Sequence, residues 1–235
     1  MTSFSVTPIG VVSSPYKEKF AIPRQPGLVS AAKGVIKLIG EFNNPHMVQD
    51  LEQYSHIWLL FQFHETVEQG WKPLVRPPRL GGNTKTGVLA TRSTYRPNGI
   101  GMSVVKLDDV KIDKGTVAIH VAGIDLLDNT PIIDIKPYIP YSDAHPDAHG
   151  SIASSAPSQL HVQYSDAASE QLHRFSREIP ELNAFIRQVL SQDPRPAYRK
   201  SKIDDKTYAM HVYNLNVSWR MIAADIIEVT SLEKR

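Results

Sequence analysis

The amino-acid sequence predicts a mainly β protein, in which an antiparallel sheet or barrel is followed by a small α+β domain. Short runs rich in Val, Ile and aromatic residues recur from residue 6 to residue 135, and some alternate apolar with polar side chains, as in 117–121. Gly, Pro and Asn lie between these runs, a spacing that is typical of antiparallel β architectures. After residue 141 the composition becomes small and polar, and two helical patterns follow.

The first domain is predicted to span residues 1–141. Its strands are expected at residues 6–12, 34–39, 57–63, 86–90, 102–107, 116–121 and 131–135. Residues 45–54 carry apolar side chains at helical spacing, so one short helix is expected between the second and third strands.

Residues 142–160 are predicted to form a linker, because they are rich in Ser, Ala, Pro and other small or polar residues. The second domain then spans residues 161–235. A helix is expected over 167–177, and a second helix with Pro180 in its first turn is expected to end near Asp193. Three strands are expected to close the chain, at residues 208–213, 217–223 and 226–230.

Several classes of site are excluded by what the sequence lacks. The chain has no cysteine, so disulfides, thiolate nucleophiles and cysteine-ligated metals are ruled out. Neither the Walker spacing nor a Gly-x-Gly-x-x-Gly motif occurs, and the histidines form no recognisable ligand set, so neither a Rossmann-type site nor a metal is expected. Without a signal peptide or an apolar run near the ~20 residues that cross a bilayer, a cytoplasmic protein without a membrane partner is expected.

The net charge of +2 conceals an uneven distribution. The segment 69–107 contains seven Lys and Arg residues and no Asp or Glu, which leaves 19 cations and 24 anions elsewhere. Such a stretch is a candidate footprint for a phosphate-rich partner, and the interleaved Trp71 and Tyr95 can stack on bases. The alternative is a solvated basic loop whose cations pair with acids elsewhere. A second, less pure basic patch spans 195–202.

Polar segments constrained by Pro and Gly alternate with the predicted strands, and they resemble the TrmO family (also called TsaA or YaeB). The match runs nearly end to end and in order, through residues 14–20, 23–27, 76–82, 91–98, 134–138 and 193–199. The resemblance implies an S-adenosylmethionine-dependent tRNA methyltransferase that acts on N6 of threonylcarbamoyladenosine, next to the anticodon on its 3′ side. It further implies a homodimer whose antiparallel β-barrel binds the cofactor without a Rossmann domain.

Transferred motif by motif, the resemblance assigns the cofactor contacts to Arg24, Gln25, Pro26, His64, Glu65, Arg92, Met102, Ala122, Gly123, Ile124 and Asp125. One departure from the family pattern is Gly99, where a proline is common. Glycine there is expected to loosen the backbone of that loop.

The chemistry is expected to need a base or a proton relay, because the N6 lone pair is delocalised into the adenine ring and a urea carbonyl. The candidate bases are Glu65, Asp125 and Asp134, although a lone aspartate more often serves a turn or a cap. Glu65 would need a pKa raised by partial burial to act near neutral pH.

The tRNA anticodon stem-loop is the expected partner. Its contacts are expected at Arg76, Arg79, Lys85 and Arg96, and at Arg195, Tyr198 and Arg199 in the second domain. Two other functions fit the same residues: a small-molecule methyltransferase on this scaffold, and a non-catalytic module that binds RNA or a nucleotide.

Overall fold

The computed structural model describes residues 4–78, 84–150, 157–196, 199–200 and 205–235. Its first domain is a closed barrel of six strands, which confirms the predicted barrel. Around the barrel the order is β1-β2-β7-β6-β3-β8, and every neighbouring pair is antiparallel. The strands are β1 (Gly10–Ser13), β2 (Lys33–Leu38), β3 (His56–Gln62), β6 (Ile100–Asp113), β7 (Thr116–Ala122) and β8 (Pro131–Pro137).

Alternation along the strands builds the barrel core. In β3 the side chains of Ile57, Leu59 and Phe61 are buried, whereas Trp58 and Leu60 between them are not. The same period of two runs through β6, where Gly101, Ser103, Val105 and Leu107 are buried. Successive side chains of a strand point to opposite faces, so every second residue enters the core.

Two of the predicted elements of the first domain are wrong. Residues 45–54 form two short 3-10 turns, Pro45–Val48 and Leu51–Gln53, because Asp50 between them adopts a left-handed conformation with φ of 65°. The strand predicted at 86–90 shrinks to β5 (Thr86–Gly87), which pairs with β4 (Leu74–Val75) in a two-stranded sheet outside the barrel. Residues 88–90 continue as a 3-10 turn.

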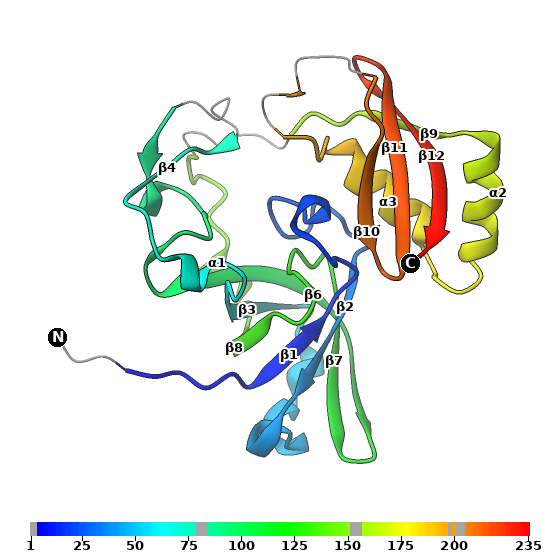
Figure 1. Ribbon diagram of the computed structural model, residues 1–235. Coiled ribbons are helices and arrows are strands. Elements are labelled where there is room, and N and C mark those ends of the chain that lie inside the picture. The colour runs from blue at the N-terminus through cyan, green and yellow to red at the C-terminus, as the bar shows by residue number, and fades with distance from the viewer. Residues whose placement is uncertain (1–3, 79–83, 151–156, 197–198, 201–204) are drawn as a thin grey trace.

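The second domain is a four-stranded sheet with two helices packed against it (Figure 1). The sheet order is β10-β11-β12-β9, formed by β9 (His161–Tyr164), β10 (Tyr208–Val212), β11 (Leu215–Ala223) and β12 (Ile226–Lys234). The sequence did not indicate β9, which pairs parallel with β12. The helices are α2 (Asp166–Phe175) and α3 (Leu182–Ser191), and a single-turn helix α1 (Pro140–Asp143) ends the barrel domain.

Helix α3 buries the apolar face that its sequence predicts, with Leu182, Phe185, Ile186, Val189 and Leu190 all inside. Its start differs from the prediction, because Pro180 precedes the helix and Glu181 occupies the N-cap position in a left-handed conformation.

The two domains share one continuous hydrophobic core. The fully buried ring of Tyr16, in the β1–β2 loop, packs against Phe185 of α3 with 5.7 Å between centroids. Phe185 in turn meets Tyr213 edge-on at 5.2 Å, and Tyr16 forms a β-bridge with Val212. In Figure 1 the second domain and the β4–β5 sheet lie on the same side of the barrel.

Candidate functional site

The loop 24–27 lies against the end of β7, although about a hundred residues separate them in sequence. The amide of Gly27 donates to the carbonyl of Gly123 at 2.8 Å, and the amide of Gly123 donates to Ala32 at 2.9 Å. Both glycines have positive φ, 77° and 74°, and a Cβ on Gly123 would lie 3.2 Å from the Cα of Gly27. Two predicted cofactor segments, 24–26 and 122–125, therefore meet backbone to backbone.

A third predicted segment joins them through Arg92. Its Nη1 donates to Oε1 of Gln25 at 2.6 Å, so the guanidinium lies over the 24–27 loop. The positive charge of Arg92 also acts to lower the pKa of Asp125. Arg92, Gln25 and Asp125 thus form one cluster at the rim of the barrel.

Asp125 is the carboxylate that the fold buries in this cluster. Burial raises its pKa to about 6, against the lowering effects of the Ser103 side chain, the backbone N–H of Asp125 itself and Arg92. The residue keeps part of its surface exposed, yet its Oδ1 is buried and has no hydrogen-bond partner among the described residues. A buried acceptor without a donor is costly, so this oxygen is available to a donor on a ligand.

Ser103 is a site residue that sequence reasoning missed. Its side chain is only 2% exposed inside the barrel on β6 and acts on the carboxyl group of Asp125. The alternation of buried and exposed residues could have identified Ser103, because it places this polar residue at a core-facing position between Gly101 and Val105.

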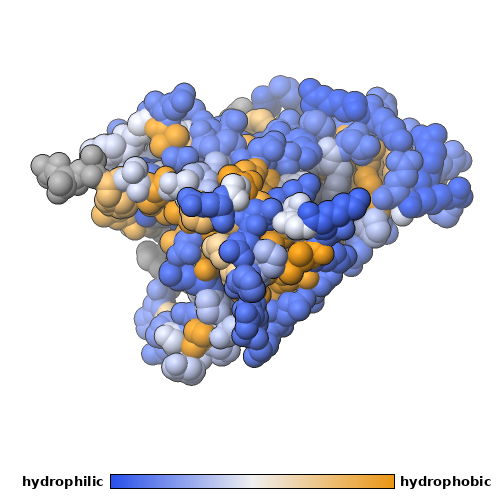
Figure 2. All heavy atoms as spheres, turned by 90° about the horizontal axis from the view of Figure 1, so that it is seen from below, coloured by the Kyte–Doolittle hydropathy of each residue, from blue (hydrophilic) through white to orange (hydrophobic). Residues whose placement is uncertain are grey.

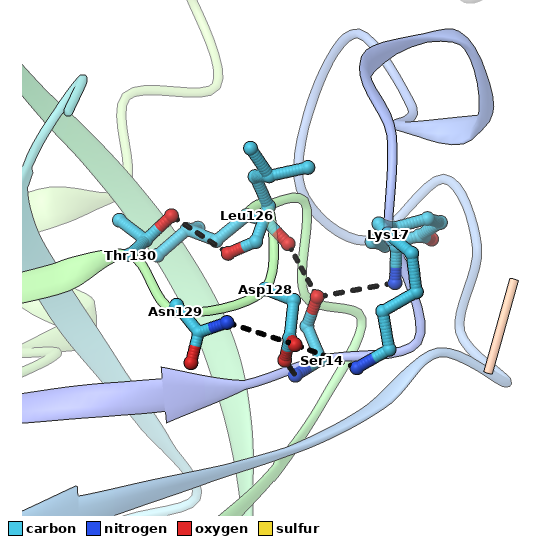
Figure 3. A network of polar contacts seen from close by, with 8 residues as sticks. Ser14, Lys17, Leu126, Asp128, Asn129 and Thr130 are labelled. Atoms are coloured by element: carbon cyan, nitrogen blue, oxygen red, sulfur yellow. Dashed lines mark hydrogen bonds and ion pairs between the residues drawn. The ribbon is translucent and has the colours of Figure 1, made fainter. Parts of the chain in front are cut away.

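A polar network fixes the turn that follows Asp125 (Figure 3). The amide and hydroxyl of Ser14 donate to Oδ1 of Asp128 at 2.9 Å and to the carbonyl of Leu126 at 2.7 Å. Lys17 pairs with Oδ2 of Asp128 at 2.7 Å, and Thr130 closes the turn through the carbonyl of Leu127. Asp128 therefore has the structural role in a turn that is typical of a lone aspartate. Ser14, like Ser103, supports this region and was not among the predicted site residues.

Tyr16 brings a second buried polar group close to Asp125. Its hydroxyl is buried without a hydrogen-bond partner in the described part of the chain. Burial, followed by the charges of Asp125 and Tyr213, raises its pKa well above the ordinary value. The hydroxyl therefore stays protonated.

The other two candidate bases lie elsewhere. The side chain of Glu65 is 53% exposed and pairs with Lys19 at 3.6 Å, so the partial burial that its role as a base requires is missing. This ion pair does bring the His64–Glu65 segment next to the β1–β2 loop. Asp134 lies on β8 and pairs with Lys136 at 3.0 Å, and its Oδ1 accepts from the amide of Ile135.

Met102 shares the outer barrel face with Asp134, because both residues are in register with Leu60 of β3. Its side chain is half exposed and points away from the interior position of Ser103. The fold thus separates Met102 from the cluster around Asp125 within this chain.

The basic stretch lies mostly in the segment around β4 and β5. Arg76 and Lys85 are exposed, Lys72 lies 4.5 Å above the ring of Tyr95, and Arg96 donates to the carbonyl of Thr91. Of the cations of this stretch that the structure describes, only Lys106 forms an ion pair, with Asp108. The described residues therefore do not support the alternative in which acids elsewhere in the fold neutralise these cations.

The second basic patch differs. The guanidinium of Arg195 is buried against Asp193, with Nε to Oδ1 and Nη2 to Oδ2 both at 2.8 Å, so it stabilises the end of α3. Arg199 is half-buried. Arg79 and Tyr198 lie outside the described residues.

A groove of about 650 Å³ lies between the barrel and the second domain. Its lining residues include Lys17, Lys33, His120 and Tyr213, but they include none of the predicted cofactor contacts.

In the part of the chain that the structure describes, no group of three or more His, Asp or Glu residues is arranged to hold a metal ion. None of the described helices has the length and apolar composition needed to cross a bilayer.

Comparisons with known proteins agree with this architecture. Residues 11–144 match the model of the tRNA-methyltransferase O N-terminal domain, and residues 157–235 match that of the TrmO C-terminal domain. The chain is 51% identical to the tRNA (adenine(37)-N6)-methyltransferase of Escherichia coli, over 100% of both chains. It is 46% identical, over 96% of each chain, to a Pseudomonas aeruginosa protein named as an S-adenosylmethionine-dependent methyltransferase, RcsF. A crystal structure of TrmO from Pseudomonas aeruginosa superposes with a TM-score of 0.83, at 39% identity over 99% of both chains.

Proposed function

The chain belongs to the TrmO family of S-adenosylmethionine-dependent tRNA methyltransferases, and from that premise we propose that it methylates N6 of threonylcarbamoyladenosine next to the anticodon, on its 3′ side. The family transfers a methyl group from S-adenosylmethionine to N6 of an adenine in tRNA. The threonylcarbamoyl group on the target adenosine is proposed in addition to this family activity.

The cofactor site is proposed where Arg24–Pro26, Arg92 and Gly123–Asp125 meet. Two observations support it: the contact of Gly27 with Gly123, where a Cβ on Gly123 would lie 3.2 Å from the Cα of Gly27, and the unpartnered Oδ1 of Asp125. S-adenosylmethionine supplies a methyl group on a positively charged sulfonium, together with an ammonium and a carboxylate. The guanidinium groups of Arg24 and Arg92 suit the carboxylate of the cofactor, and the carboxylate of Asp125 suits its sulfonium and ammonium groups.

Asp125 is proposed as the proton acceptor in preference to Glu65 and Asp134. The observation that carries this is a buried, unpartnered Oδ1 on a carboxyl group whose pKa is raised to about 6. Such a group is mostly ionised at neutral pH and is still a stronger base than an exposed carboxylate. When the methyl group passes from the sulfonium to N6, its bond to sulfur breaks and the sulfur leaves as a neutral thioether. The N6 proton passes to Oδ1 of Asp125, which leaves the nitrogen neutral.

The test is the single-turnover rate at saturating cofactor. A general base contributes about 10²- to 10⁴-fold, so Asp125→Asn is expected to slow methyl transfer by at least about 100-fold. The wild-type rate should rise with an apparent pKa near 6, and the variant should lose that dependence. Glu65→Gln is the matched control and should stay within a few-fold. If Asp125→Asn kept its rate and lost only cofactor affinity, the carboxylate would serve the cofactor's cations instead.

The substrate is tested with labelled S-adenosylmethionine and bulk tRNA prepared with and without the threonylcarbamoyl modification. Label should enter only the modified tRNA. Equal labelling of both preparations would contradict the proposed substrate. Label in small molecules alone would favour the small-molecule methyltransferase, and no label at all would favour the non-catalytic binding module.

Two further features are proposed from the family: a homodimer, and a cytoplasmic location where tRNA is modified. Large apolar side chains are exposed in the β4–β5 segment, where Trp71, Leu74 and Leu89 are 60%, 52% and 78% exposed. Figure 2 shows apolar patches interrupting a largely hydrophilic surface. Exposed apolar groups of this kind favour association. Light scattering after size exclusion should give twice the 26.3 kDa chain mass, and a monomeric mass would contradict the dimer.

A further inference from the structure

Two glutamine side chains, Gln188 of α3 and Gln192 at its C-cap, reach out of the second domain and bind the loop that follows the proposed cofactor segment. Oε1 of Gln188 accepts from the amide of Ala31 at 2.9 Å, and its Nε2 donates to the hydroxyl of Ser30 at 3.0 Å. Nε2 of Gln192 donates to the carbonyl of Leu28 at 3.3 Å. These contacts satisfy three polar groups in a stretch of loop that has no strand partner.

The same loop is anchored to the barrel immediately on either side. Gly27 donates to Gly123, and Gly123 donates to Ala32, so residues 28–31 form the span between two hydrogen bonds to one glycine. Val29 and Ala31 are buried in this span. Residues 28–31 are continuous with Gly27, which contacts Gly123, and with Gln25, which accepts from Arg92, so the contacts with α3 lie directly beside the proposed cofactor cluster.

We propose that Gln188 is a positioning residue, through which the second domain holds the 24–27 loop in its cofactor-binding conformation. This inference rests on the proposed cofactor site. It assigns the second domain a role in S-adenosylmethionine affinity in addition to any contact with tRNA. The apparent affinity for a ligand falls when only a fraction of the protein populates the conformation that binds it. A loop that is already held in this conformation in the free protein therefore binds its ligand more tightly.

The test compares isosteric and conservative changes at one position. Gln188→Leu keeps the volume and removes both contacts, and it should raise the dissociation constant and KM for S-adenosylmethionine about tenfold, as expected from two hydrogen bonds of ordinary net strength. The kcat at saturating cofactor should stay within about twofold, because the chemistry is not touched. Gln188→Glu should restore affinity, since a carboxylate accepts from Ala31 and from the rotatable hydroxyl of Ser30.

Gln171→Leu is the matched control. Its Oε1 accepts from the amide of Leu232 at 2.8 Å, entirely within the second domain. Its melting temperature is expected to fall as much as that of Gln188→Leu, with cofactor affinity unchanged. Equal losses of affinity in the two variants would show a general stability effect and overturn the positioning role.

Calorimetric titration of Gln25→Ala with S-adenosylmethionine separates this inference from the site on which it rests. If Gln25→Ala weakens binding and Gln188→Leu does not, the site stands and the positioning role is wrong. If Gln25→Ala binds as tightly as wild type, the loop is not part of the cofactor site, and both proposals fall.

Discussion

At the scale of single residues, the site depends on two glycines that allow backbones to touch. Gly27 and Gly123 both adopt left-handed conformations, but only Gly123 has a neighbour within contact distance of an added Cβ. Gly123 lies two residues before Asp125, whose carboxylate is buried in the cluster. Backbone geometry and the environment of Asp125 are therefore set together.

Gly123→Ala should be the more damaging of two similar substitutions. A Cβ placed 3.2 Å from the Cα of Gly27, at a φ of 74°, should lower the free energy of unfolding by about 1–3 kcal/mol and weaken cofactor binding. Gly27→Ala carries the same φ penalty with open space around the new methyl group, so its loss should be smaller. Urea unfolding and cofactor titration measure both effects, and equal losses would contradict the steric argument.

The raised pKa of Asp125 also links stability to pH. The folded protein binds this proton with a pKa of about 6, above the 3.8 of the free side chain. The favourable contribution is therefore complete below about pH 4 and is lost as pH rises through 6, by at most about 3 kcal/mol. Asp125→Asn removes that loss, so its stability relative to wild type should increase between pH 4 and pH 7. A pH-independent difference in unfolding free energy would contradict the burial of a titrating group.

At the scale of elements, the β4–β5 segment separates the basic residues from the acids of the barrel. Arg76 and Lys85 lie exposed beside the short sheet, whereas Lys106, on the long strand β6, pairs with Asp108 at 3.2 Å. The two groups of cations belong to one acid-free stretch of sequence but differ in their surroundings. Only the exposed and unpaired ones are free to replace counterions on RNA phosphates.

Replacing Arg76 and Lys85 with Ala should weaken tRNA binding and flatten its salt dependence. Each phosphate contact contributes ~0.7 to 0.9 to the slope of log K against log salt, so the double variant should lose about 1.5. Filter binding at several KCl concentrations gives the slope. Lys106→Ala is the matched control, and a double variant with an unchanged slope would exclude these two side chains as phosphate contacts.

At the scale of the whole molecule, the second domain is joined to the barrel by a shared core. The ring of Phe185 packs against Tyr16 of the first domain and Tyr213 of the second, and it is fully buried. Because burial of such rings contributes several kcal/mol, neither domain is expected to unfold alone. The same interface brings α3 to the loop beside the cofactor cluster.

Calorimetry should show one unfolding transition for the wild-type chain. Phe185→Ala should lower stability by about 3–5 kcal/mol and split the transition in two, since it removes the ring that couples the domains. Phe175→Ala deletes a buried ring of α2 inside the second domain, and it should lower stability while weakening coupling less. Two transitions in the wild-type protein would contradict a shared core.

The sequence alone determined the β-barrel, the two C-terminal helices and the family, because alternation, helical spacing and motif order are local properties of the chain. It could not determine that residues 45–54 break at Asp50, since a single left-handed residue leaves no periodic trace. The tertiary structure alone separated the three candidate carboxylates, burying Asp125 and leaving Glu65 and Asp134 paired with lysines at the surface. Burial depends on what packs against a residue from distant parts of the chain, and here Ser103 of β6, Tyr16 of the β1–β2 loop and the 24–27 loop lie around the Asp125 segment.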